Sequence, residues 1–197
     1  MTIAAHPNRA RLVARIAALG RGFDVPFDGE LFRFINPTFS KAADIISGAG
    51  ALHAAGRWNL AGAARLSYAA QTPETALSEA LAHVRYYGLP TSKAFPRVLV
   101  ALRLRVQRAL DLRDGQLRRA LVLSEDTIRN LDWRAANQGG GEAITQAWGS
   151  ALAARGFEAA IVPSAADARG TNVLVFPGNL QTGSRFEVIH EVKWPGK

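Results

Sequence analysis

The chain has 197 residues, of which 48% are hydrophobic, and it carries a formal net charge of +8 at pH 7. This length suits one domain with a full core, so we expect a single domain. The chain has no cysteine, which excludes disulfides, thiolate nucleophiles and sulfur metal sites. It also has no apolar run of roughly 18 residues and no signal-peptide pattern, so we expect a soluble cytoplasmic protein.

The positive charge comes almost wholly from arginine, whose planar guanidinium binds phosphates and carboxylates through paired hydrogen bonds. Genomic base composition explains many of these arginines equally well. No reading motif and no cluster of basic and aromatic residues is evident, so we expect neither nucleic-acid nor membrane binding. The histidines, His6, His53, His83 and His190, lack ligand spacing, so we expect no metal site.

Apolar positions recur at helical spacing over residues 7–19 and predict an N-terminal helix. After a turn rich in glycine, proline and aspartate, residues 30–35 alternate as a strand in which Arg33 shares a face with apolar neighbours. A charged residue in that setting needs a partner or a ligand, because burying a lone charge is costly. Residues 42–64 predict a short helix and a long ordered loop that contains Arg57.

A short strand at residues 66–69 contains Tyr68, and Thr72-Pro73 then predicts the start of a helix that ends near residue 87. On this helix Glu79 lies on a face beside the apolar stripe. His83 follows one turn later, where an ordinary surface pair with Glu79 is the favoured interpretation.

The second half of the chain predicts a half-buried strand, a mainly helical stretch and three further strands, at residues 97–106, 117–154, 157–162, 171–176 and 185–192. Interrupted strands and helices in this order indicate an α+β domain with mixed sheets flanked by helices, rather than a regular βαβ array. We predict an N-terminal helical extension over residues 1–29 and a catalytic domain over residues 30–197.

Six polar or aromatic residues stand at intervals in this apolar sequence: Arg33, Arg57, Asn59, Tyr68, Glu79 and Ser164. Each one alone has an ordinary explanation. Glu79 suits a helix surface, and Ser164 suits a turn, because no Gly-x-Ser-x-Gly elbow surrounds it. Together they do not make up a complete metal site or a complete catalytic triad. They suit a site that binds an anionic dinucleotide and stabilises positive charge on a sugar.

With their neighbours, these residues resemble the RES-domain family, which is named for an Arg, a Glu and a Ser. Here these would be Arg33, Glu79 and Ser164. The resemblance rests on the Phe-flanked Arg33, Gly56-Arg57-Trp58-Asn59, Tyr68 followed by Thr75-Ala76-Leu77-Ser78-Glu79, and Val162-Pro163-Ser164-Ala165 before Asn172-Val173-Leu174. It implies a toxin with a fold similar to ADP-ribosyltransferase toxins, an activity that degrades NAD, and neutralisation by an Xre-type helix-turn-helix antitoxin.

The residue types agree with that chemistry. Cleaving the nicotinamide–ribose bond develops positive charge on the sugar, and a nearby carboxylate, Glu79, stabilises it. Tyr68 offers a face to the nicotinamide ring, while Arg33 and Arg57 bind the ribose and pyrophosphate. Asn59 and Ser164 are expected to assist substrate binding, and Ser164 to position Arg33, Glu79 or the ligand.

Three functions stay open at this point. The first is an NAD-degrading toxin that acts by glycohydrolysis or phosphorolysis, with NAD as substrate and no resident cofactor. The second is an ADP-ribosyltransferase that modifies a protein or nucleic acid from the same pocket. The third is a non-catalytic module that binds anions or a partner, with an affinity that falls steeply with salt. The oligomeric state is undetermined, and a homo-oligomer is one option.

Overall fold

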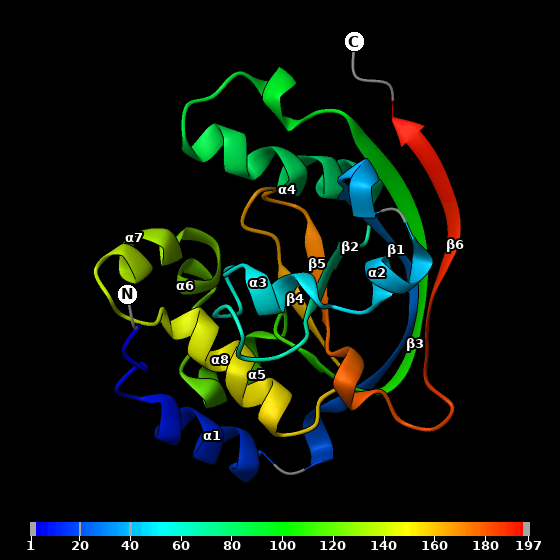
Figure 1. The fold of residues 1–197 in the computed structure, drawn as a ribbon. Coiled ribbons are helices and arrows are strands. Elements are labelled where there is room, and N and C mark those ends of the chain that lie inside the picture. Colours follow the sequence, from blue (N-terminus) through cyan, green and yellow to red (C-terminus); the bar gives the residue numbers. More distant parts are fainter. Residues whose placement is uncertain (1–2, 20, 40, 195–197) are drawn as a thin grey trace.

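The protein is described by a computed structural model that covers residues 3–19, 21–39 and 41–194. Within them, six strands form one mixed sheet in the order β1-β2-β5-β4-β3-β6 (Figure 1). They are β1 (Asp24–Ile35), β2 (Ser67–Ala70), β3 (Arg97–Asp111), β4 (Ala159–Pro163), β5 (Thr171–Val175) and β6 (Arg185–Trp194). With the flanking helices, this sheet confirms the predicted α+β class.

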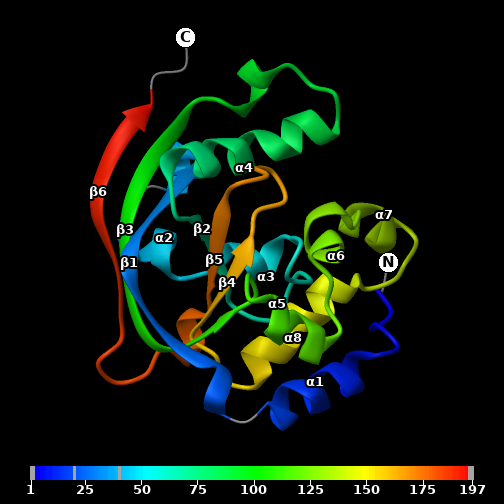
Figure 2. The ribbon, with the colours of Figure 1, turned by 180° about the vertical axis from the view of Figure 1, so that it is seen from behind.

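The sheet closes on itself because β1 also pairs with β3. The β1–β3 ladder is antiparallel and runs from Asp24 opposite Leu110 to Ile35 opposite Val98. On its other side, β3 pairs antiparallel with β6 and then, at its end, parallel with β4. The strands β1, β3 and β6 therefore form a curved outer wall, and β2, β5 and β4 lie between this wall and most of the helices (Figures 1 and 2).

The inner face of this closed sheet holds one part of the core. Alternate residues of β3 point inward and are at most 4% exposed. They pack with inward side chains from β1, β4 and β5 in a cluster that includes Leu31, Ile35, Val98, Val100, Leu102, Leu104, Val106, Ala159, Ile161, Val173 and Val175. The apolar face that the alternation predicts for β3 is therefore buried in the structure.

A second part of the core lies between the outer faces of β4 and β5 and a group of helices. Leu174 from β5 and Val162 from β4 pack there against Trp148 and Leu152. The helices of this half are α1 (Arg9–Ala18), α3 (Gly50–His53), α5 (Gly115–Leu121), α6 (Glu125–Asn130), α7 (Trp133–Gln138) and α8 (Ile144–Ala154). Among them, α1 buries Leu12 and Ile16 in this cluster.

On the other side of the sheet, α4 (Pro73–Tyr86) covers the outer face of β1, where Ala76 packs against Phe34 and Ala70. The Thr72 side chain accepts a hydrogen bond from the amide of Thr75, so the predicted cap and proline start are confirmed. The remaining short elements are α2 (Ala42–Ile46) and the 3₁₀ turns η1 (Arg21–Phe23), η2 (Pro37–Phe39), η3 (Thr91–Ala94) and η4 (Pro177–Asn179).

Several secondary-structure elements differ in extent or number from the sequence prediction. The first strand starts at Asp24, inside the predicted turn, and a register shift between Val25 and Phe27 accommodates Pro26, which has no amide to donate. β3 continues to Asp111 because its end pairs with β1 and β4. The stretch 42–64 contains α3 in addition to the predicted short helix. The predicted domain boundary between residues 29 and 30 falls inside β1.

No helix in the described part of the chain combines the length and apolar character needed to cross a membrane.

The contact between α8 and the loop before β2 gives a test of the fold. A Cβ atom on Gly149 would lie 1.8 Å from the Trp58 carbonyl oxygen. We therefore expect Gly149→Ala to lower the free energy of unfolding by about 1–3 kcal/mol, because the helix must move away from the loop. In an exposed helix the same change stabilises by roughly 1 kcal/mol. Urea denaturation measures the difference.

Gly178→Ala is the matched control, because a Cβ there meets nothing within 4 Å. Equal stability of the Gly149→Ala variant and the wild type would contradict the packing described between α8 and Trp58.

Candidate functional site

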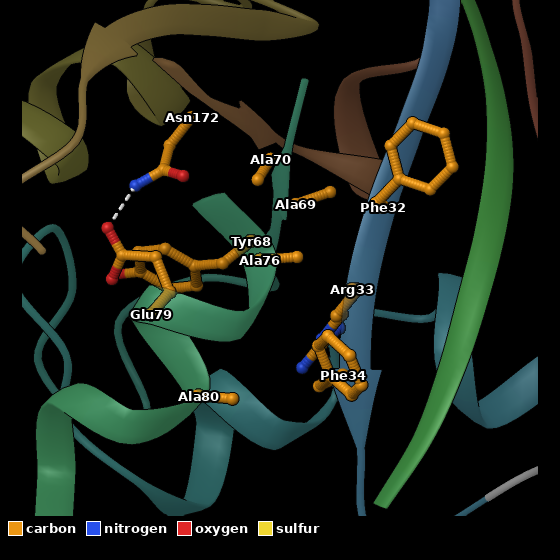
Figure 3. A pocket seen from close by; sticks show the side chains of 10 residues that line it. All are labelled: Phe32, Arg33, Phe34, Tyr68, Ala69, Ala70, Ala76, Glu79, Ala80 and Asn172. Atoms are coloured by element: carbon orange, nitrogen blue, oxygen red, sulfur yellow. Dashed lines mark hydrogen bonds between the residues drawn. The ribbon is translucent and has the colours of Figure 1, made fainter. Parts of the chain in front are cut away.

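A cavity opens where β1 and β2 separate. These two strands pair at a single position, Phe32 opposite Ala70, after which β2 follows β5 and β1 follows β3. The helix α4 forms the remaining wall. The cavity has a volume of about 200 Å³ and is lined by Phe32, Arg33, Phe34, Tyr68, Ala69, Ala70, Ala76, Glu79, Ala80 and Asn172 (Figure 3).

Glu79 projects from α4 and is held by two side chains from the sheet. Its Oε1 atom accepts hydrogen bonds from Ser164 Oγ at 2.6 Å and from Asn172 Nδ2 at 2.5 Å. In the described chain no hydrogen bond reaches its Oε2 atom. The carboxylate is therefore fixed through one oxygen, while the other stays available to a bound molecule.

Ser164 lies just beyond β4 and is fully buried. Its Oγ atom accepts hydrogen bonds from the amides of Ala166 and Asp167, both at 3.1 Å, and donates its own proton to Glu79. The serine thus caps a turn and orients the carboxylate at the same time. It does not line the cavity, so its contact with a ligand would pass through Glu79.

Arg33 reaches the cavity from β1 and shares its strand face with Leu31 and Ile35, as the alternation predicts. Its Nη1 atom donates to Ser67 Oγ at 3.0 Å and to the Ile45 carbonyl at 3.5 Å. Burial lowers the pKa of the guanidinium below its ordinary range, yet arginine stays protonated in proteins. Among the described residues no carboxylate forms an ion pair with Arg33, so the cavity wall carries an uncompensated positive charge that favours an anion.

Arg57 lies near the cavity but does not line it. Its Nη1 atom donates to the Leu131 carbonyl at 2.8 Å, which joins the loop before β2 to the end of α6. Burial lowers the pKa of Arg57, and the nearby negative charge of Glu79 raises it. The charge of Glu79 thus offsets part of the pKa lowering caused by burial.

Tyr68 presents its ring to the cavity, while its hydroxyl group is used within the protein. The hydroxyl donates to Asn59 Oδ1 at 2.8 Å and accepts from the Trp58 amide at 3.0 Å. Burial raises the pKa of the phenol well above its ordinary range, so the hydroxyl is neutral at physiological pH. Tyr68 can therefore offer an aromatic face but no phenolate.

Asn59 lies behind Tyr68 and does not line the cavity. It is only 3% exposed, and its Nδ2 atom donates to the carbonyls of Ala51, Ala54 and Leu60. Asn59 thus holds the loop and the Tyr68 hydroxyl in place through these hydrogen bonds. His83 also stays outside the cavity wall, where its ring contacts Tyr87 edge-on.

Asn172 is a site residue to which sequence reasoning assigned no role. It lies in β5 opposite Ala70 of β2, lines the cavity and binds Glu79. Asparagine is depleted in strands, so its occurrence in β5 just before the apolar residues Val173–Val175 was the available signal. In the described chain no three acidic or histidine side chains gather in a way that could hold a metal ion.

These contacts define an α+β protein whose cavity combines a fixed carboxylate, a buried arginine and an aromatic face. The model of the RES domain family matches residues 30–195, and the chain belongs to this family. A chain from the crystal structure of the M. tuberculosis MbcT–MbcA toxin–antitoxin complex has a similar fold, with a TM-score of 0.71 and 23% identity, over 93% of this chain and 91% of that chain. No curated protein matches the sequence.

The buried phenol of Tyr68 predicts a pH dependence of stability. Above pH about 10 the unfolded chain loses the phenolic proton that the folded chain keeps, so the free energy of unfolding should fall as pH rises. This contribution is fully present below pH about 10. The free energy of unfolding of the Tyr68→Phe variant should fall less steeply above that pH. At neutral pH this variant should be about 1–3 kcal/mol less stable than the wild type, because Asn59 and the Trp58 amide lose a hydrogen-bond partner.

Urea denaturation between pH 7 and 11 measures both effects. Tyr87→Phe serves as the control, because that tyrosine is 50% exposed and its ring contacts survive the change. The burial of the Tyr68 phenol would be refuted if both variants followed the wild-type curve.

Proposed function

We propose that this protein is the toxin of a toxin–antitoxin pair and that it degrades NAD⁺ by cleaving the nicotinamide–ribose bond. Membership of the RES domain family supports the proposal. The observation that carries it is the geometry around Glu79, whose carboxylate is held by Ser164 and Asn172 in a cavity that also exposes Arg33. This arrangement supplies a cation stabiliser and an anion-binding group in one small space.

In the proposed reaction the bond between the ribose C1′ atom and the pyridinium nitrogen breaks, and its electron pair neutralises the departing nicotinamide. Positive charge then develops on the ribose, where Glu79 stabilises it through Oε2, which accepts no hydrogen bond from the described residues. Water attacks C1′ and loses a proton, which yields ADP-ribose, or phosphate attacks and yields the ribosyl phosphate. Because the leaving group is already a cation, the reaction needs no general acid.

The cavity suits one end of a dinucleotide. Its volume of about 200 Å³ is below the about 300–1,000 Å³ of pockets that enclose drug-sized ligands, so the nicotinamide end would enter and the rest would lie outside. The Tyr68 ring offers a surface for the nicotinamide. Arg33 and Arg57 supply charge-assisted hydrogen bonds to the ribose and the pyrophosphate.

A partner follows from the same proposal. The structurally similar chain comes from a toxin–antitoxin complex. We propose a corresponding antitoxin of the Xre helix-turn-helix type for this protein, and a cytoplasmic location, where NAD⁺ is consumed.

The enzymatic part is tested by incubating the purified protein with NAD⁺ and measuring free nicotinamide and the ribose product. We expect Glu79→Gln and Arg33→Ala each to lower kcat/KM by about 100-fold to 1,000-fold, because each removes a charge that stabilises the transition state. Glu74→Gln on the same helix and Arg85→Ala on its exposed end are the matched controls. Full turnover by Glu79→Gln would exclude the assigned mechanism.

The acceptor is identified in the same assay by adding phosphate or a bacterial extract. A ribosyl phosphate product would assign phosphorolysis, and ADP-ribose alone would assign hydrolysis. Nicotinamide release that requires the extract and labels a macromolecule would instead assign an ADP-ribosyltransferase.

The biological part is tested in growing bacteria. Expression of the wild-type chain should lower cellular NAD⁺ and stop growth, whereas Glu79→Gln at equal abundance should do neither. Co-expression of a small helix-turn-helix protein encoded beside this chain should restore growth. Equal growth arrest by wild type and Glu79→Gln would show that toxicity does not depend on the proposed chemistry.

A further inference from the structure

The side-chain amide of Asn172 is satisfied at one end only. Its Nδ2 atom donates to Glu79, whereas its Oδ1 atom is buried and accepts no hydrogen bond from the described residues. Buried polar atoms without a partner are uncommon, because each one loses its bonds to water without replacement. The other three such side-chain atoms belong to Asp24, Thr145 and Trp148, which lie outside the cavity wall.

The hydrogen-bond network fixes which end of this amide faces Glu79. Ser164 Oγ accepts two backbone amides, so its own proton goes to Glu79 Oε1. That oxygen is therefore an acceptor, and Asn172 must turn its NH₂ group toward it. The carbonyl oxygen then points away from Glu79, as Figure 3 shows. Rotating the amide by half a turn would bring two acceptors together at a distance of 2.5 Å.

An acceptor held in this way selects a ligand that carries a hydrogen-bond donor at the matching position. In NAD⁺ the end proposed to enter the cavity offers two kinds of donor, the carboxamide N–H group and the ribose hydroxyl groups. We propose that Asn172 is a specificity-determining residue whose Oδ1 atom accepts a hydrogen bond from one of these donors. This inference rests on the proposed function, since it assigns a further contact to the same substrate.

The position of Asn172 in β5 makes this contact independent of any moving loop. Its backbone pairs with Ala70 of β2 on one side and Val162 of β4 on the other. Ala70, its partner in β2, lines the same cavity with a single methyl group. A site that provides a buried acceptor rejects analogues without the donor, because the acceptor then stays unpaired in the complex.

The test compares substrates that differ by one donor. Binding constants and kcat/KM are measured for NAD⁺, for 3-acetylpyridine adenine dinucleotide, which lacks the amide N–H group, and for NAD⁺ analogues without the 2′ or 3′ hydroxyl group on the nicotinamide ribose. We expect the wild type to favour NAD⁺ by about tenfold or more over one of these analogues. Asn172→Leu should reduce that preference to near unity.

Ser164→Ala is the matched control, because it also removes a hydrogen bond to Glu79 Oε1 but leaves the Asn172 carbonyl in place. This variant should lower kcat/KM for all the dinucleotides by a similar factor, so that the ratios between them stay the same. Asn172→Ala replaces the leucine variant if leucine prevents folding. The analogue against which the wild type discriminates, but Asn172→Leu does not, shows whether the donor is the amide or a hydroxyl group.

Two results would overturn the inference. One is a wild type that binds all four dinucleotides equally well. The other is an Asn172→Leu variant that weakens all of them by the same factor, which would leave Asn172 as a support for Glu79 only. The binding measurements keep the two proposals separate. A wild type that binds NAD⁺ selectively without cleaving it would refute the proposed function and still support the role of Asn172.

Discussion

The unequal pairing of β1 is the constraint on which the site depends. Its ladder with β3 closes the sheet and buries the inner core, whereas its contact with β2 is limited to Phe32 and Ala70. A complete β1–β2 ladder would leave no space between the strands. Because the ladder stops after one pair, Arg33 and Tyr68, one on each strand, both reach the cavity that opens there. The closed sheet supplies the rigidity, and the incomplete pair supplies the opening.

Glu79 joins the helix α4 to two strands that are far from it in the sequence. Its partners Ser164 and Asn172 lie 85 and 93 positions away, at the end of β4 and the beginning of β5. The antiparallel pairing of these strands brings the two partners to the same end of the sheet. The carboxylate is thereby held by the sheet as well as by its own helix, and a site held on rigid elements keeps its geometry without a ligand.

The sequence predicted the parts of this site that depend on local pattern. Thr72 and Pro73 indicated where α4 begins, and alternation indicated the face of Arg33. Contacts between distant residues left no such pattern. Nothing in the apolar stretch of β5 showed that Asn172 would meet Glu79, because that contact depends on strand order. The segment around Asn59 also pointed to the site, and in the fold the Asn59 amide holds the loop and the Tyr68 hydroxyl.

The free protein bears two costs at this site that its core must offset. Within the described part of the chain, Arg33 loses water without gaining a carboxylate partner, and the Asn172 carbonyl is buried without a donor. Either cost would be removed by a small change, such as an acidic residue beside the arginine or an apolar residue in place of the asparagine. Each change would also remove a group that can recognise a ligand. Local destabilisation of this kind is typical of functional sites. The proposed substrate would satisfy both groups together, because it carries anionic phosphates and hydrogen-bond donors on one molecule.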